Sequence, residues 1–204
     1  MMNQHGRLFY LMGASGSGKD SILSECRARL SNEPDYRDMR CFIAHRYITR
    51  KPELRGENHI WLSEDEFSSR MSNHAFSMNW HANGFLYGVG AEIDNWLASG
   101  INVIVNGSRG YLSSAIDKYP HTIVPVHIHV EPEDLRMRLI KRGRESNEDI
   151  EKRIHRAVKL NKDLDPCVQT IDNNGSLSSA VDSFFTIMSR ESSGRAEYKM
   201  EGYR

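Results

Sequence analysis

The sequence is poor in cysteine: three of its 204 residues are cysteines, and no two of them form a C-x-x-C pair. Cys26, Cys41 and Cys167 lie far apart, which argues against a disulfide framework and favours a reducing compartment. Long hydrophobic runs are missing as well, and the first residues, MMNQHGRLFYLM, hold one short apolar segment. This pattern indicates neither a signal peptide nor a membrane span, so we expect a cytoplasmic protein that does not bind membranes.

Neither sign of charge is in excess, because 27 basic residues are balanced by 27 acidic residues. No global field therefore favours nucleic acid, and any anion must be bound by a local cluster. An apolar content of 39% in a chain of this length allows one core, or one core with a small subdomain. We expect a small-molecule substrate; a monomer and a homodimer both stay open.

Short apolar runs alternate with amphipathic segments along most of the chain. We expect strands at 7–12, 41–45, 101–105, 122–130 and 168–173. We expect helices at 20–30, 90–100, 112–119 and 176–190, and a long charged helical region at 132–161 that is interrupted near Gly143. Strands alternating with helices predict an α/β fold with a mainly parallel sheet flanked by helices.

Residues 45–88 interrupt this alternation, since they are rich in arginine, histidine, asparagine, glycine and aromatic residues. One helix signal stands out there, a capping box made by Ser63 and Glu66. We interpret the segment as an inserted, partly exposed subdomain. The three tryptophans of the chain are expected to pack in the core or in this subdomain: Trp61, Trp80 and Trp96.

The string GASGSGKDS, residues 13–21, contains the complete pattern G-x-x-x-x-G-K of a phosphate-binding loop. It lies between an expected strand and an expected helix, the context that the motif requires. Backbone N–H groups, the charge of Lys19 and the helix N-terminus would all face phosphate oxygens. A glycine-rich turn without a ligand is the alternative, and the spacing and flanks argue against it. We therefore predict a triphosphate site at Gly13, Ala14, Ser15, Gly16, Ser17, Gly18, Lys19, Asp20 and Ser21.

The position after Lys19 is unusual, because the pattern asks there for a Ser or Thr whose hydroxyl binds Mg²⁺, and this chain has Asp20. Many phosphate-loop enzymes also place an Asp at the end of a core strand to organise magnesium, where this chain has neutral Asn106. We hypothesise an exchange, in which Asp20 supports Mg²⁺ directly or through water. In the alternative, Asp20 complements the helix N-terminus and Ser21 serves the metal.

Three further segments resemble the guanylate kinase family. AHRYITRKPELRGENHIWL resembles that family's S-x-x-T-R-x-P-R-x-x-E, and NWHANGFLYGVGAEI resembles its E-W-x…Y-Y-G. LRMRLIKRGRESNEDIEKRI resembles its lid, R-L-x-x-R-G…I-x-x-R. The resemblance spans about residues 7–185 and implies a P-loop kinase fold with ATP as co-substrate, Mg²⁺, an inserted substrate-binding subdomain and an Arg-rich lid at about 136–157. Residues 1–189 then form a single domain, followed by a polar tail, 190–204, that we expect to be mobile.

The departures from the family concern the residues that read guanine. Asn79 replaces the Glu before the Trp, and Val89 replaces the Ser or Thr after the Tyr-Gly. Two phosphate ligands of the family are replaced as well, an Arg by Glu53 and a Tyr by His59. A site built to hydrogen-bond a base discriminates strongly through those bonds, so their loss argues that guanine is not the substrate.

A basic cluster remains on the acceptor side: His45, Arg46, Arg50, Lys51, Arg55 and His59. Alone, it would be interpreted as a solvated loop; beside a phosphate loop and an Arg-rich lid, we favour phosphate binding. The strings LMGASGSGKDS, AHRYITR, ENHIWLSEDEF, WHANG, YGVGAEIDNWL and VNGSRGYL resemble a branch of the family that acts on a sugar bisphosphate in phosphonate breakdown.

This resemblance implies that the γ-phosphoryl group of ATP moves to the 1-phosphate of ribose 1,5-bisphosphate, which gives 5-phosphoribosyl 1-diphosphate. The acceptor-binding residues are expected to be Arg46, Arg50, His59, Asn79, Tyr87, Asn106, Ser108 and Arg109. A guanylate-type nucleoside monophosphate kinase is the alternative, since Asn79 can hydrogen-bond a base. A non-catalytic guanylate-kinase-like binding module is disfavoured by the intact Lys19 and lid arginines.

A phosphate acceptor is already ionised at neutral pH, so no general base is needed. Catalysis then depends on in-line positioning and on neutralising the transferring group. Lys19 would hold the donor, and the residues that match the family's lid would close over it: Arg138, Arg142 and Arg153. For the arginines without a firm family match, we favour a solvated helix face: Arg136, Arg144 and Arg156.

Overall fold

The structure is a computed structural model that describes residues 5–37, 39–51, 59–143, 146–162 and 164–193. Several residues used in the sequence interpretation lie outside these ranges: Glu53, Arg55, Arg144 and the tail from 194 on. Among the described residues, no helix combines the length and apolar character that crossing a membrane requires.

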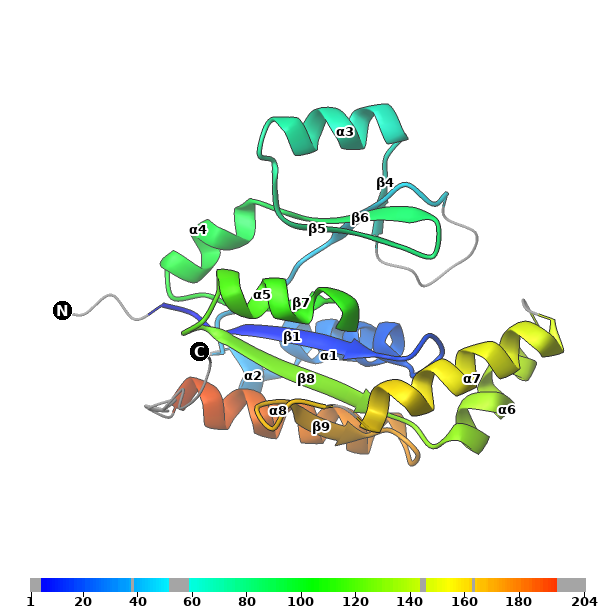
Figure 1. Cartoon of the computed structure of the whole chain (residues 1–204). Helices are drawn as coiled ribbons and strands as arrows, with labels where there is room; N and C mark the ends of the chain where they lie inside the picture. Colours follow the sequence, from blue (N-terminus) through cyan, green and yellow to red (C-terminus); the bar gives the residue numbers. More distant parts are fainter. Residues whose placement is uncertain (1–4, 38, 52–58, 144–145, 163, 194–204) are drawn as a thin grey trace.

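A five-stranded parallel sheet forms the centre of the molecule (Figure 1). Its strands, in chain order, are β1 (Leu8–Gly13), β2 (Cys41–Ile43), β7 (Asn102–Asn106), β8 (Ile123–His129) and β9 (Gln169–Asp172). The spatial order is β2-β7-β1-β8-β9, and every neighbouring pair is parallel. Every residue of β7 is buried, as the near-continuous apolar run predicted.

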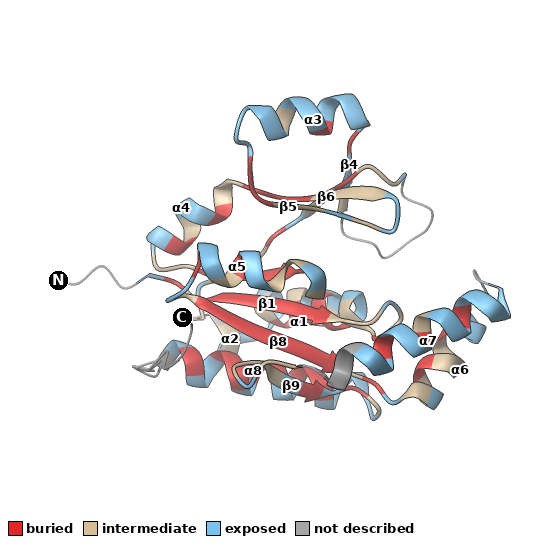
Figure 2. Cartoon of the chain, in the orientation of Figure 1, coloured by how far each residue is buried: buried red, intermediate tan, exposed pale blue. Residues whose placement is uncertain are grey.

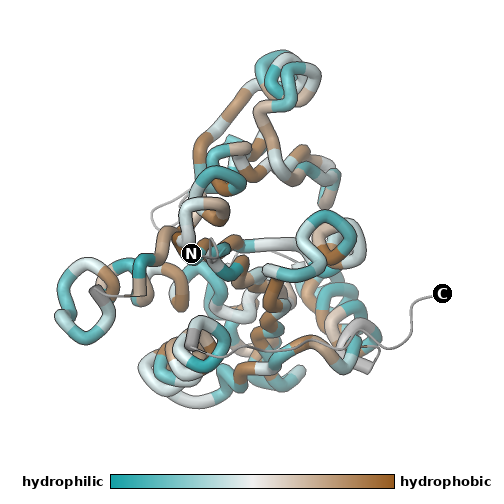
Figure 3. Tube along the Cα trace, turned by 90° about the vertical axis from the view of Figure 1, so that its left-hand side faces the viewer, coloured by the Kyte–Doolittle hydropathy of each residue, from teal (hydrophilic) through white to brown (hydrophobic). Residues whose placement is uncertain are grey.

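Helices cover both faces of this sheet (Figure 1). One face carries α1 (Lys19–Asn32), the short α2 (Pro34–Arg37) and α8 (Leu177–Ser193). The other carries α4 (Glu92–Ala98) and α5 (Leu112–Lys118). Successive side chains of a strand point to opposite faces, so each helical layer closes its own core. Figure 2 shows β1 and β8 buried between these layers, and Figure 3 shows the hydrophobic segments gathered in the middle of the molecule. The predicted α/β fold is confirmed.

A second, four-stranded sheet was not foreseen from the sequence. It comprises β3 (Arg46–Ile48), β4 (His59–Trp61), β5 (Phe76–Ala82) and β6 (Phe85–Gly90), in the order β4-β3-β6-β5. Its long hairpin, β5–β6, turns at Asn83 and Gly84, whose φ angles of 51° and 79° are those of a tight Asn-Gly turn. The sheet lies above the central one in Figure 1.

Helix α3 (Glu64–Ser72) covers the outer face of this second sheet. Its N-cap is Ser63, as predicted, and the Ser63 Oγ accepts a hydrogen bond from the backbone N–H of Glu66 at 3.2 Å. The Glu66 carboxylate pairs with Arg70 at 2.7 Å.

The charged helical region forms two helices, α6 (Pro132–Arg142) and α7 (Asn147–Lys162). Gly143 ends α6 with a φ of 65°, which confirms the predicted interruption. The two helices share a small core of their own, built from Leu135, Leu139, Ile150, Ile154 and Ala157. Figure 1 shows this pair beyond the carboxyl ends of β1 and β8.

Helix α8 runs past the expected start of the tail and ends at Ser193. Glu191 is only 6% exposed, and its backbone oxygen accepts a hydrogen bond from Nε of Arg7 at 3.2 Å. The first residues assigned to the tail are therefore part of the packed helix.

Candidate active site

A cavity of about 1050 Å³ opens at the carboxyl ends of β1 and β7, where parallel α/β sheets commonly bind ligands. Its walls come from the phosphate loop, the second sheet, the segment after β7 and the α6–α7 pair. Seventeen predicted residues line it: Gly13, Ala14, Ser15, Gly16, Gly18, Lys19, Asp20, Ser21, Arg46, Arg50, Tyr87, Asn106, Ser108, Arg109, Arg138, Arg142 and Arg153.

The phosphate loop follows β1 directly and turns into α1 at Gly18. Gly16 and Gly18 both have a φ of 89°, a conformation that side-chain-bearing residues rarely adopt. Ser17 is 1% exposed and does not line the cavity. Its Oγ lies 3.4 Å from Nζ of Lys19, so its side chain contacts the loop itself.

Lys19 folds back over the loop. Its Nζ donates to the carbonyl oxygens of Gly13 and Ala14, each at 2.8 Å. Burial lowers the pKa of Lys19 to about 8; neighbouring Asp20 acts in the opposite direction, and Arg46 and Arg109 lower it further. An anionic ligand in the cavity would favour the charged form of this lysine.

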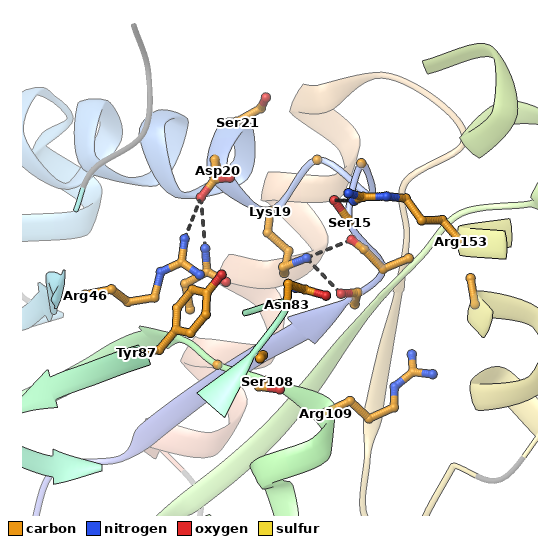
Figure 4. A pocket seen from close by; sticks show the side chains of 18 of the residues that line it. Ser15, Lys19, Asp20, Ser21, Arg46, Asn83, Tyr87, Ser108, Arg109 and Arg153 are labelled. Atoms are coloured by element: carbon orange, nitrogen blue, oxygen red, sulfur yellow. Dashed lines mark hydrogen bonds and ion pairs between the residues drawn. The ribbon is translucent and has the colours of Figure 1, made fainter. Parts of the chain in front are cut away.

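Asp20 points toward the second sheet and away from the phosphate loop (Figure 4). Its Oδ1 accepts a hydrogen bond from Nδ2 of Asn106 at 2.9 Å and lies 3.5 Å from Nη2 of Arg46. Ser21 is exposed at the cavity edge, and Figure 4 shows it directed away from Lys19. Asp20 thus joins three elements that the sequence separates: α1, β3 and the end of β7.

The carboxylate of Asp20 fits a magnesium ion. Its side chain is 50% exposed within the cavity, and both contacts use the same oxygen. Among the described residues, no group of three or more His, Cys, Asp or Glu side chains could form a full metal cage. Mg²⁺ in phosphoryl-transfer sites does not need one, because it takes one or two carboxylates together with phosphates and water.

One face of the β5–β6 hairpin lines the cavity on the side where the sequence predicts the acceptor, and we call it the acceptor wall. The indole of Trp80 stacks on the ring of Tyr87, with centroids 5.6 Å apart and planes at 3°, and Trp80 also meets Tyr111 at 5.5 Å. Trp80 and Tyr87 line the cavity, and the same face continues with Met78 and Val89, which are fully buried. The wall is therefore aromatic and apolar, rimmed by arginines.

Asn79, which the sequence assigned to the acceptor site, lies neither on this wall nor in the cavity lining. Strand side chains alternate, and Asn79 precedes Trp80, so it points to the face that α3 covers. His59 also lies outside the cavity lining. It sits on the edge strand β4, where its Nε2 contacts the carbonyl oxygen of Arg50 at 3.3 Å.

Arg109 approaches the cavity from the short helix η1 (Arg109–Tyr111). Its Nη2 lies 2.6 Å from Nε2 of His127, which is 1% exposed on β8. Burial, reinforced by the charges of Arg109, His129 and Lys19, lowers the pKa of His127 to about 4. The imidazole is thus neutral at physiological pH, and its Nε2 accepts from the guanidinium.

The segment before η1 is held from below by Tyr10. The Tyr10 hydroxyl donates to the backbone oxygen of Ser108 and accepts from its backbone N–H, both at 2.8 Å. Gly107 is required here, because a Cβ would lie 2.1 Å from the Tyr10 ring. The phenol therefore fixes the backbone between Asn106 and Arg109.

The α6–α7 pair supplies arginines from the opposite side. Arg153 donates to Oγ of Ser15 at 2.7 Å, and Arg138 donates to the backbone oxygen of Asn173 at 2.5 Å. Arg136 instead pairs with Glu151 at 2.8 Å and Glu133 at 3.1 Å on the outer face, which confirms that it is a surface residue.

Several lining residues were missed by the sequence interpretation: Ser24, Glu25, Trp80, Ala82, Asn83, Phe85, Gly107, Gly110, Arg156, Ala157 and Leu177. Trp80 was expected to pack, and Arg156 was assigned to the solvated face. Asn83 and Gly84 could have predicted the hairpin, because an Asn-Gly pair favours a two-residue turn. Such a turn fixes the register of the two strands and therefore which side chains share a face. Trp61, also expected to pack, is 43% exposed.

Comparison with known proteins gives consistent matches. A family model described as guanylate kinase matches residues 5–191. The Psychromonas ingrahamii protein named ribose 1,5-bisphosphate phosphokinase PhnN is 49% identical over 183 residues, 90% of this chain and 90% of that protein. The Klebsiella pneumoniae protein of the same name is 43% identical over 94% of this chain and 97% of that protein. The crystal structure of guanylate kinase from Anaplasma phagocytophilum matches with a TM-score of 0.70 over 96% of this chain and 90% of that one; at 16% identity this shows the fold alone.

Proposed function

The chain belongs to the guanylate kinase family, and from that premise we propose that it transfers the γ-phosphoryl group of ATP to ribose 1,5-bisphosphate, giving 5-phosphoribosyl 1-diphosphate. It is a kinase, and the relatives that are 40–49% identical to it over most of its length share the name ribose 1,5-bisphosphate phosphokinase. The expected P-loop kinase fold agrees with the family match and with the solved guanylate kinase.

The observation that carries the choice of acceptor is the composition of the acceptor wall. The strand face beside Tyr87 carries Met78, Trp80 and Val89: Met78 and Val89 are fully buried and do not line the cavity, and the Trp80 indole can only donate a hydrogen bond. Arg46, Arg50 and Arg109 stand around this wall, and guanidinium groups bind phosphate oxygens in pairs. A sugar with two phosphates and no base suits such a pocket, whereas a guanylate-type acceptor is not favoured.

Three groups of residues divide the work. The loop from Gly13 to Gly18 and the Lys19 ammonium hold the β and γ phosphates of ATP. Arg46, Arg50 and Arg109 hold the acceptor phosphates, and Trp80 with Tyr87 flank the sugar. Arg138, Arg142 and Arg153 close over the transferring group, neutralise its charge and exclude water that would compete as acceptor. No side chain has to remove a proton, because the attacking phosphate oxygen is already ionised.

Asp20 would hold Mg²⁺, and the ion would supply positive charge to the phosphates of ATP when bound. Asn106 orients the Asp20 carboxylate through Oδ1, and the same oxygen faces Arg46. Free cysteines in the described part of the chain, Cys26, Cys41 and Cys167, fit a reducing compartment, and we place the enzyme in the cytoplasm.

The experiment that tests this function follows the label from [γ-³²P]ATP in the presence of Mg²⁺ and ribose 1,5-bisphosphate. The expected product is 5-phosphoribosyl 1-diphosphate labelled in its terminal phosphate. Label recovered only as inorganic phosphate, or transferred to GMP in preference to the sugar bisphosphate, would overturn the assignment.

A further inference from the structure

Asn173 lies at the point where the phosphate loop, the central sheet and the α6–α7 pair meet. It follows β9 directly and is 4% exposed. Its backbone N–H donates to the carbonyl oxygen of His129 at 2.9 Å, which fixes the residue to the end of β8. The side chain and the backbone oxygen then reach two different parts of the donor site.

The side-chain amide holds the phosphate loop. Nδ2 of Asn173 donates to the carbonyl oxygen of Ser17 at 2.7 Å in a buried hydrogen bond. The amide can approach this closely only because residue 18 is a glycine, since a Cβ there would lie 2.5 Å from Nδ2. The peptide between Ser17 and Gly18 leads into α1, so its orientation decides where the loop N–H groups and Lys19 point.

The backbone oxygen of Asn173 holds an arginine of the opposite wall. Nη2 of Arg138 donates to this oxygen at 2.5 Å, and Nη1 lies 3.7 Å from the position of a Cβ on Gly18. Arg138 lines the cavity from α6, 35 residues away in sequence. One residue thus contacts both the loop that cradles the donor phosphates and an arginine that faces them.

We propose that Asn173 is a positioning residue for phosphoryl transfer, which holds Arg138 in register with the phosphate loop. The inference rests on the proposed function, because it assigns Arg138 to the transferring phosphate. Removing the amide breaks the link between the Ser17 carbonyl and the strand end to which Arg138 is tied, so the phosphate loop and Arg138 are no longer held to the same residue. Errors of about 1 Å in such positioning can cost about 100-fold in rate.

The chain offers a matched control in Asn102, another buried asparagine, 8% exposed, at the start of β7. Its amide donates to the carbonyl oxygen of Met39 at 3.0 Å, and its Oδ1 accepts from the backbone N–H of Arg7 at 2.8 Å. Asn102 lies at the opposite end of the sheet from the cavity, so Asn102→Ala removes comparable buried hydrogen bonds without touching the donor site.

The test measures ATP affinity by calorimetry without acceptor, and kcat and both KM values with ribose 1,5-bisphosphate, at a temperature where thermal unfolding shows every variant folded. Asn173→Ala should weaken ATP binding and lower kcat, each by about tenfold or more, while the acceptor KM stays within about twofold. Asn102→Ala should lower the unfolding temperature and leave all these constants unchanged. Asn173→Asp, which keeps the volume and removes the donor, should behave as Asn173→Ala does, and it serves if the alanine variant does not fold.

The coupling to Arg138 is tested in a double-variant cycle. In an Arg138→Ala background, Asn173→Ala should change kcat by less than about threefold, since the arginine to be positioned is gone. Equal losses with and without Arg138, or a lowered unfolding temperature with unchanged ATP affinity and kcat, would overturn the proposal. A wild-type chain that binds ATP but does not turn over the sugar bisphosphate would contradict the proposed function instead, and the ATP affinities would still decide the role of Asn173.

Discussion

At the scale of single residues, the site depends on side chains whose orientation is set by their neighbours. Asp20 illustrates this, because it occupies the position where the phosphate-loop motif carries a hydroxyl, and we propose that it serves Mg²⁺ there. Its Oδ1 accepts a hydrogen bond from Asn106 and faces Arg46, so a carboxylate in the first turn of α1 is oriented by the end of β7 and by the second sheet. Two replacements thus occur together: Asp20 stands where the motif has a hydroxyl, and Asn106 stands where many phosphate-loop enzymes have a carboxylate at the end of a core strand.

Asp20 and Ser21 make different predictions for magnesium. Asp20→Ser should raise the Mg²⁺ concentration that gives half-maximal rate by about tenfold, since a carboxylate is lost from the cavity. Ser21→Ala is the matched control and should change it by less than about twofold, because Ser21 is directed away from Lys19. The measurement is initial rate against Mg²⁺ at saturating ATP; a larger effect of Ser21→Ala would reject the exchange.

His127 makes a prediction about stability and pH. Its pKa is about 4 in the folded chain against an ordinary value of 6.5. Between pH 4 and pH 6.5 the imidazole is therefore protonated in the unfolded chain and neutral in the folded chain. The contribution of neutral His127 to the free energy of unfolding is therefore complete above pH 6.5 and is lost as the pH falls toward 4. Over this window the free energy of unfolding changes by at most roughly 1.4 kcal/mol per pH unit.

His127→Gln keeps an acceptor for Arg109 and removes the titration, so denaturant unfolding across this pH window should show a weaker pH dependence than wild type. Identical slopes for the two proteins would mean that His127 does not carry this dependence.

At the scale of elements, the site is assembled from parts that differ in how well the sequence encodes them. The phosphate loop is a local motif, and its glycines, lysine and flanking strand and helix follow from a single string. The central strands can also be predicted from the sequence, because strands buried on both faces must be apolar throughout. The short strands β3 and β4 and the hairpin β5–β6 carry arginine, histidine and asparagine and lack such a pattern.

The position of Asn79 could not be predicted because β5 and β6 lack such an apolar pattern. Which face a strand residue occupies depends on the register of its hairpin, and a shift of one residue reverses every side chain. Pairing of Trp80 with Tyr87 fixes that register here and turns Asn79 outward. His59 lies on the edge strand β4 and outside the cavity lining, and the motif alone could not predict this because the strand order depends on the pairing of the whole sheet.

The acceptor wall yields a prediction for two tryptophans of the same sheet. Trp80→Ala should raise the acceptor KM by about tenfold with little change in the ATP KM, because the stacked Trp80–Tyr87 pair forms the wall. Trp61→Ala is the control, since Trp61 is 43% exposed on β4 and lies outside the cavity lining. Steady-state kinetics in both substrates would show the difference; equal effects of the two changes would remove Trp80 from the site.

The α6–α7 pair makes a comparable prediction for arginines on opposite faces. Arg153→Ala should lower kcat by about 1000-fold, because Arg153 faces the phosphate loop and contacts Ser15. Arg136→Ala should lower it by less than about threefold, since the ion pairs of Arg136 with Glu151 and Glu133 lie at the surface. Single-turnover rates would separate chemistry from product release. Similar losses in both variants would indicate a structural role for the helix pair rather than a role of Arg153 at the phosphate.

At the scale of the whole molecule, two sheets and a helix pair surround one cavity at the carboxyl edge of the central sheet. The central sheet fixes the donor site, the second sheet presents the acceptor wall, and the α6–α7 pair brings arginines to the junction. A chain with equal numbers of acidic and basic residues can therefore bind highly anionic substrates, because its arginines gather where the three parts meet.

The most direct test of this account is the ratio of kcat/KM for ribose 1,5-bisphosphate to kcat/KM for GMP, measured on the wild-type chain with saturating ATP and Mg²⁺. We expect a ratio of about 100 or more in favour of the sugar bisphosphate, because the two positions that read guanine in the family are here Asn79, which does not line the cavity, and the fully buried Val89. A ratio near or below one would contradict it and would place the chain among kinases that read the base.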